Sequence, residues 1–198
     1  MNSSTTWGLL ALTAIAAMPA AAQAPAQPAA PSPPQTTPPS PAAQAQPALQ
    51  PAVETVILDG KGEKIGTLAI KGGERATVAR ITIQAGGLPS GWHGIHFHAV
   101  GDCSDAGKYE ASKAHVNHGG AKHGLLNPEG PDEGDLPNLF VAADGSANAE
   151  VSTRTPLDGR NGLRDSDGSA LIFHANQDDH ISQPIGGAGA RIACAVIK

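Results

Sequence analysis

Alternating apolar and polar positions recur from about residue 53 onward and predict short β-strands. The clearest case is residues 75–85, where the two kinds of side chain alternate: Ala79, Ile81 and Ile83 against Arg80, Thr82 and Gln84. A period of two is typical of an antiparallel strand with one buried face. This segment is therefore expected to cover a core with its apolar side.

Other β-rich runs are separated by turn residues: Thr55–Leu58, Gly66–Ile70, Gly94–His98, Asn138–Ala142, Ala147–Val151, Ala170–His174 and Ile192–Ile197. Gly86–Ser90 predicts a turn, and Asp144-Gly145 between two runs indicates a hairpin. No amphipathic pattern of three helical turns is present. The chain is therefore expected to be all-β, with about eight antiparallel strands in a sandwich or flattened barrel.

The stretch from Val100 to Pro137 carries no clear strand pattern. Loops of this length are uncommon in compact domains unless they have a function. We therefore expect this loop to hold much of the chemistry.

The first part of the chain has a different composition. All 13 Lys and Arg and all 18 Asp and Glu lie from Glu54 onward. Residues 1–24 resemble a signal peptide, because the apolar run Leu9–Met18 is too short to span a bilayer and small residues follow it. A retained membrane anchor is the alternative. After cleavage no membrane span is expected.

Residues 25–52 consist almost entirely of Pro, Ala, Gln, Ser and Thr and are expected to form a disordered linker. A PxxP ligand is the alternative to a spacer. The remainder, residues 53–198, has the size of one domain. The formal net charge of −5 argues against a nucleic-acid partner. Cys103 and Cys194 form an even pair in an exported chain, which favours one disulfide over two free thiols.

Metal-binding residue types are concentrated in this domain. His96 and His98 occupy positions i and i+2 of a strand, so both imidazoles point to one face. Flanking Ile95 and Phe97 indicate a buried opposite face, which favours a metal-ligand pair over two surface histidines. His115, His123, Asp132 and Asp135 follow in the long loop, and His174 ends an apolar strand. Imidazole and carboxylate are suitable ligands for zinc or copper.

Together these motifs resemble the copper/zinc superoxide dismutases, specifically the bacterial secreted type. The matching stretches are Gly91–His98, Gly101–Cys103, Lys122–Gly124, Gly134–Asn138, Phe173–Ala175 and Gly189–Cys194. The resemblance implies a Greek-key β-sandwich or barrel with long metal-binding loops. It also implies a periplasmic or otherwise secreted protein. The family includes monomers and dimers, so a homodimer stays an open alternative.

The resemblance also implies a role for each matching residue. The implied copper ligands are His96, His98, His115 and His174, and the implied zinc ligands are His115, His123, Asp132 and Asp135. His115 is then shared between the two metals, and Asp178 links a ligand of each. Cys103 and Cys194 correspond to the family disulfide. Arg191 corresponds to the arginine at the mouth of the copper site.

Asp132 departs from the family pattern, which has a histidine at this position. Three interpretations stay open: zinc binds through Asp132, zinc is weak or absent and copper works alone, or a neighbouring histidine such as His118 substitutes. His118 and His180 are otherwise interpreted as loop residues. His93 resembles a structural histidine that packs behind the site.

The implied reaction is the dismutation of superoxide to dioxygen and hydrogen peroxide. It is carried out by a copper ion whose oxidation state changes by one. Zinc has no redox chemistry of its own. His115 would give a proton to the departing peroxide, and Arg191 would attract the anionic substrate. The alternative is a periplasmic copper-binding or copper-delivery protein with little turnover, which would not need Arg191. A β-sandwich that has lost its metals is a third reading, which the four copper-type histidines argue against.

Overall fold

The computed structural model describes residues 52–198. The signal peptide expected over residues 1–24 lies outside the described residues, as does the linker expected over residues 25–52 except for its last residue. Within the described part no helix is long and apolar enough to cross a membrane.

The described residues form an all-β domain with a single short 3-10 turn at Glu110–Ser112. Its strands are β1 (Val53–Asp59), β2 (Lys64–Gly72), β3 (Thr77–Ile83), β4 (Gly91–His93), β5 (Ile95–His98), β6 (Leu139–Val141), β7 (Ala147–Thr153), β8 (Ser169–His174) and β9 (Arg191–Ile197). The all-β prediction is therefore confirmed.

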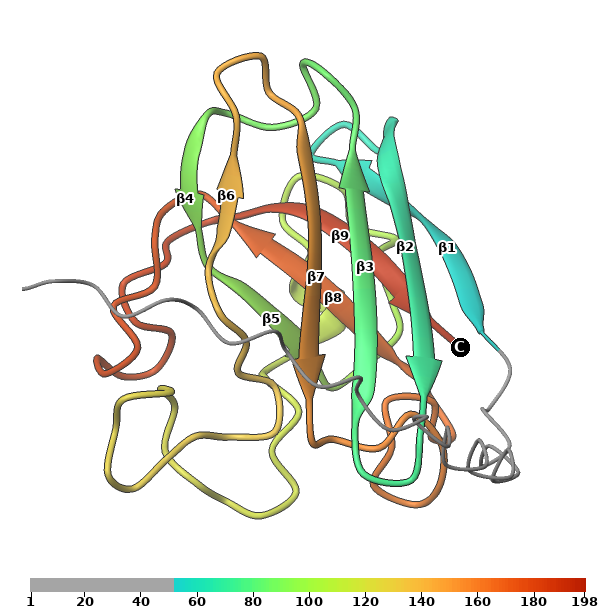
Figure 1. Cartoon of the computed structure of the whole chain (residues 1–198), viewed down its shortest axis with the longest axis vertical. Coiled ribbons are helices and arrows are strands. Elements are labelled where there is room, and N and C mark those ends of the chain that lie inside the picture. Colours follow the sequence, from blue (N-terminus) through green and yellow to red (C-terminus); the bar gives the residue numbers. More distant parts are fainter. Residues whose placement is uncertain (1–51) are drawn as a thin grey trace, which may run out of the picture. The chain divides into compact units, whose positions relative to one another are not determined.

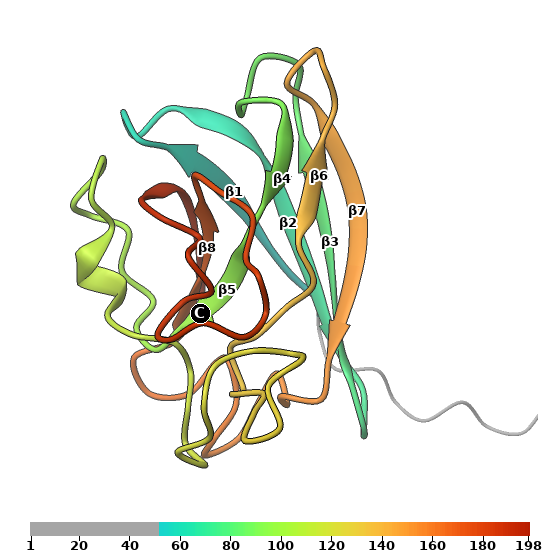
Figure 2. The same cartoon turned by 90° about the vertical axis from the view of Figure 1, so that its left-hand side faces the viewer.

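Seven strands make one antiparallel sheet in the order β5-β8-β9-β1-β2-β3-β7, and β4 pairs with β6 in a small second sheet. Strands β2, β3 and β7 form one layer, and β5, β8 and β9 cross behind them (Figure 1). The view turned by 90° shows the two layers edge-on, with the long loops gathered beside β5 and β8 (Figure 2). This arrangement is the flattened barrel expected from the sequence.

The period-two pattern of residues 75–85 is confirmed in β3. Ala79, Ile81 and Ile83 are buried there, whereas Arg80 and Thr82 are exposed. The buried face joins a core cluster between the layers, to which Ile57, Leu68, Phe97, Leu139, Leu171 and Phe173 also belong.

Two local features differ from expectation. Strand β4 was not predicted, because three residues are too few to show a period and it runs almost directly into β5. The turn at Asp144-Gly145 forms, with the Ala142 N–H donating to Ser146 O over 2.8 Å. However, β6 pairs with β4 and β7 pairs with β3, so the two strands beside the turn do not form a hairpin ladder.

Candidate metal centre

Strand β5 carries the first two histidines of the site. Ile95 and Phe97 join the core cluster, and His96 and His98 point to the opposite face. All four side chains are buried, because the loops that follow β5 and β8 cover the histidine face. The buried opposite face expected from Ile95 and Phe97 is confirmed.

The long loop runs back along the free edge of β5. The Phe97 N–H donates to Gly134 O, and the Val116 N–H donates to Phe97 O, over 2.9 and 2.8 Å. As a result His115 lies opposite His98, and Asp135 lies opposite His96. A side chain at position 134 would collide with the Phe97 carbonyl, so this close approach requires glycine.

The end of β8 brings in His174. A β-bulge between Phe173 and His174 shifts the ladder, and His174 then pairs with Arg191 at the start of β9. Bulges often redirect a side chain next to a functional site. The register alone therefore places the arginine beside the last histidine of the set.

Hydrogen bonds orient three of the imidazole rings. His98 Nδ1–H donates to Lys113 O over 2.7 Å, and His174 Nδ1–H donates to Gly189 O over 3.0 Å. His96 Nε2–H donates to Asp178 Oδ2 over 2.8 Å. When one ring nitrogen of a neutral imidazole donates its hydrogen to an acceptor, the other nitrogen carries no hydrogen. Its lone pair is then available to a metal ion.

The nitrogens left over are buried and have no hydrogen-bond partner: His96 Nδ1, His98 Nε2, His115 Nε2 and His174 Nε2. Buried polar atoms normally have a hydrogen-bond partner. Four unpartnered nitrogens in one cluster therefore indicate a site for a ligand. The ligand atoms of His96, His98 and His174 lie within 4.8 Å of one another. The ring of His115 lies 4.3 Å from that of His96, centroid to centroid. These residues fit a copper ion.

The charge states agree with this fit. Burial lowers the pKa of His98 to about 2 and that of His174 to about 3, and it also lowers the pKa of His96. Desolvation disfavours the charged imidazolium, so these rings are neutral at neutral pH. A neutral imidazole is the form that binds a metal ion.

A second group of ligand atoms lies on the other side of His115. It contains His115, His123, Asp132 and Asp135, whose ligand atoms are also within 4.8 Å of one another. His115 Nδ1 lies 2.9 Å from Asp132 Oδ2, and His123 Nδ1 lies 2.5 Å from Asp135 Oδ1. Two imidazoles and two carboxylates are a four-ligand set of the kind zinc accepts. The structure thus brings together every predicted zinc-type residue, including Asp132.

Asp178 contacts one histidine of each group of ligand atoms. Its Oδ2 accepts from His96, and its Oδ1 lies 3.2 Å from His123 Nε2. Burial alone would raise the pKa of Asp178, but hydrogen bonds from His123 and His96 hold it below its usual range. Burial likewise opposes the charge on His123, yet its contacts with Asp135 and Asp178 raise its pKa to about 10.

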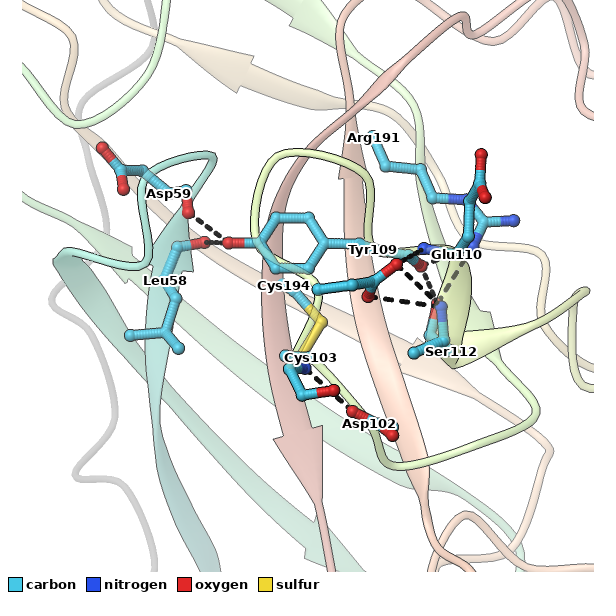
Figure 3. The surroundings of a disulfide bond; sticks show 12 residues. Leu58, Asp59, Asp102, Cys103, Tyr109, Glu110, Ser112, Arg191 and Cys194 are labelled. Atoms are coloured by element: carbon cyan, nitrogen blue, oxygen red, sulfur yellow. Dashed lines mark hydrogen bonds between the residues drawn. A yellow bond between two sulfur atoms is a disulfide. The ribbon is translucent and has the colours of Figure 1, made fainter.

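A cavity of about 300 Å³ opens onto this cluster, and His98, His115 and Arg191 are among its lining residues. Carbonyl oxygens hold the arginine in place. Its Nη1 donates to Tyr109 O over 2.6 Å, and its Nη2 donates to Lys113 O over 2.8 Å. Nη1 also lies 3.2 Å from Ser112 Oγ. Figure 3 shows the guanidinium beside Tyr109 and Ser112. These bonds fix Arg191 where it lines the cavity.

The segment that holds Arg191 is itself tied to β9 by the Cys103–Cys194 disulfide, which closes a separation of 91 residues. Figure 3 shows this bond beside Tyr109, whose hydroxyl donates to the carbonyl of Asp59. Cys194 and Tyr109 belong to a small buried cluster with Ala170 and Ile172 on the outer side of the sheet. The pairing expected from the two cysteines is present.

The remaining histidines take no part in either group of ligand atoms. His93 is buried behind His174, with Nδ1 2.7 Å from the His174 carbonyl oxygen. His118 is exposed on the loop. His180 lies in a loop as expected, but its Nε2 accepts from Asn138 Nδ2 over 3.0 Å, and its Nδ1 lies 3.4 Å from Asp178.

Comparison with known proteins identifies the family. The sequence-family model of the copper/zinc superoxide dismutases matches residues 65–197. A Cu-Zn superoxide dismutase of Caulobacter vibrioides is 45% identical over 148 residues, which cover 72% of this chain and 83% of that protein. This chain belongs to the copper/zinc superoxide dismutase family.

Solved structures of similar proteins agree with the superoxide dismutase fold. A SOD-like protein from Bacillus subtilis matches with a TM-score of 0.68 and 31% identity, over 73% of this chain and 97% of that chain. The Cu/Zn superoxide dismutase from Brucella abortus matches with a TM-score of 0.58 and 26% identity, over 75% of this chain and 100% of that chain.

Sequence reasoning missed two amides that brace this superoxide dismutase site. Asn138 Nδ2 donates to Asp178 O over 2.8 Å, and its Oδ1 accepts from the Asp178 N–H over 2.9 Å. Gln183 makes the same pair of bonds with the backbone of His123. Asn138 lies in the Gly134–Asn138 motif, which was the only signal for it. Nothing local marks Gln183.

Proposed function

We propose that this chain converts superoxide to dioxygen and hydrogen peroxide, with copper held by His96, His98, His115 and His174. The observation that carries this proposal is the set of four buried imidazole nitrogens without partners beside a cavity that Arg191 lines. When bound, copper supplies the one-electron chemistry that superoxide dismutation needs and that no side chain of this set supplies.

We assign the second group of ligands, His115, His123, Asp132 and Asp135, to zinc. The backbone N–H groups of Gly124 and Asp132 donate to Asp135 Oδ2 over 2.7 and 3.0 Å. These bonds turn Asp135 Oδ1 toward the histidines. Asp178 supports this arrangement by contacting one ligand of each group, as outer carboxylates do in metal sites generally.

His115 and Arg191 complete the proposed active site. His115 Nε2 is buried and its ring lines the cavity. Whenever this nitrogen does not hold copper, it is placed to carry a proton and give it to departing peroxide. Arg191 presents a permanent positive charge at the same cavity. In a chain with net charge −5, this local charge attracts a small anion that the rest of the surface repels.

Replacing Arg191 with alanine should lower the rate of superoxide decay by roughly tenfold or more and flatten its salt dependence, because steering by charge is lost. Pulse radiolysis at several ionic strengths measures both effects. Arg191→Lys keeps the charge and should keep most of the salt dependence. The matched control is Arg80→Ala, on the exposed face of β3. An Arg191→Ala rate equal to that of the wild type at every ionic strength would remove this role.

A copper-binding or copper-delivery protein with little turnover is the second candidate. It would use the same four histidines, but it gives no reason to anchor a guanidinium with two carbonyls at the cavity. The anchored arginine therefore favours the enzyme.

We further propose that the protein is exported to the periplasm or secreted, with residues 1–24 as signal peptide and 25–52 as linker to the domain at 53–198. The Cys103–Cys194 disulfide supports this location, because such bonds persist in oxidising compartments.

A further inference from the structure

The two halves of the metal centre present different donor atoms. The copper half offers only nitrogen, from four imidazole rings whose free atoms are buried and without partners. The zinc half offers two imidazoles and two carboxylates. This difference depends on Asp132, since an imidazole at that position would leave a single carboxylate in the zinc half.

Asp132 is held firmly as an oxygen donor. Its Oδ1 accepts from the Gly134 N–H over 2.9 Å, which turns Oδ2 toward His115 Nδ1. The residue is 7% exposed, so water does not compete freely for its charge. Asp132 and Asp135 thus each direct one fixed oxygen into the zinc half.

These donor sets favour different ions. For a given site copper(II) binds more tightly than zinc, so a site excludes copper only through its ligand types and geometry. Copper(II) favours tetragonal sites and is well matched by imidazole, whereas carboxylate oxygen suits harder ions. Zinc has no geometric preference from its d-electrons and accepts mixed nitrogen and oxygen ligands. The zinc half is poorer in nitrogen than the copper half, and its two carboxylates also offset the full charge of a divalent ion.

We propose that Asp132 sorts the two metals in this chain by making the zinc half too rich in oxygen to retain copper, so that copper stays in the four-imidazole half. The proposal rests on the proposed function, because it takes the copper and zinc halves as assigned above. The proposal adds to that function a reason why each half of the site retains a different metal.

The test compares the wild-type full-length chain with Asp132→His and Asp132→Asn. Each protein is stripped with a chelator, saturated with copper(II) alone and passed over a desalting column with a weak competing chelator. Copper per chain is then measured by mass spectrometry and by electron paramagnetic resonance. Cavities of about 300 and 400 Å³ border position 132, so an imidazole has room there.

Wild type and Asp132→Asn should retain a single copper ion per chain, whereas Asp132→His should retain a second. In a parallel loading with zinc(II) alone, zinc retention should fall in Asp132→Asn, which has the same shape as the wild-type side chain without its charge. Two coppers retained by the wild type would overturn the proposal, and so would no extra copper in a folded Asp132→His. A wild type that retains no copper at all would instead overturn the proposed function.

A second measurement needs no variant. Wild-type protein loaded with copper and zinc is incubated with excess copper(II), and its zinc content is followed with time. Zinc should stay in the protein. Replacement of zinc by copper would contradict the sorting role of Asp132 even if superoxide decay were unchanged.

Discussion

Replacing His98 with asparagine should release copper from the protein and reduce superoxide decay to the rate of the metal-free protein. The His98 ring is buried on β5, and its Nε2 is one of the four unpartnered nitrogens. Residues that hydrogen-bond to a metal ligand typically contribute about 10–100-fold to metal affinity. Removing the ligand itself should therefore lower copper affinity by more than roughly 100-fold. Copper titration against a chelator of known affinity measures the loss.

Asparagine is chosen because its side-chain N–H can still donate to Lys113 O, the acceptor that His98 Nδ1 uses. The substitution therefore removes the lone pair with little loss of hydrogen bonding. His118→Asn, on the exposed part of the loop, is the matched control and should keep wild-type copper and rate. Retention of copper with wild-type affinity by His98→Asn would show that this histidine is not a ligand.

Replacing both Cys103 and Cys194 with alanine should destabilise the domain by about 4–5 kcal/mol. The disulfide spans 91 residues, and the chain-entropy model predicts a loss of this size for a loop of that length. For a domain of this size the melting temperature should fall by on the order of 10 °C. Differential scanning calorimetry of the metal-loaded proteins measures the shift.

Loss of the disulfide should also slow superoxide decay, because the same loop supplies the carbonyls of Tyr109 and Lys113 that hold Arg191. The slower rate should come with a weaker salt dependence and an unchanged copper content. A melting temperature within about 2 °C of the wild type would contradict the stabilising role. An unchanged rate in the folded variant would show that the loop holds Arg191 without the bond.

Much of the fold could be predicted from local pattern. In β3 the apolar and polar positions alternate from Ala79 to Ile83, and burial follows the same period. Strand β4 has three residues and no period of its own. The turn at Asp144-Gly145 has clear local chemistry, but the pairing of β6 with β4 depends on strands far away in sequence. Local pattern thus predicts strands and turns better than it predicts their neighbours.

The site divides in the same way. Strand geometry predicted that His96 and His98 share a face. That His115 lies opposite His98 depends on the loop pairing with the edge of β5, which only similarity to a family could suggest. The contacts of Gln183 with the His123 backbone bring together residues 60 apart in sequence and carry no motif. Positioning contacts of this kind become visible only in the folded chain.

The measurement that tests the central claim most directly is superoxide decay as a function of copper content per chain, at constant zinc. We predict a rate that rises in proportion to copper, disappears on chelation and returns with copper but not with zinc alone. Full copper occupancy with decay no faster than that of the metal-free protein would contradict the account and favour a copper-binding protein.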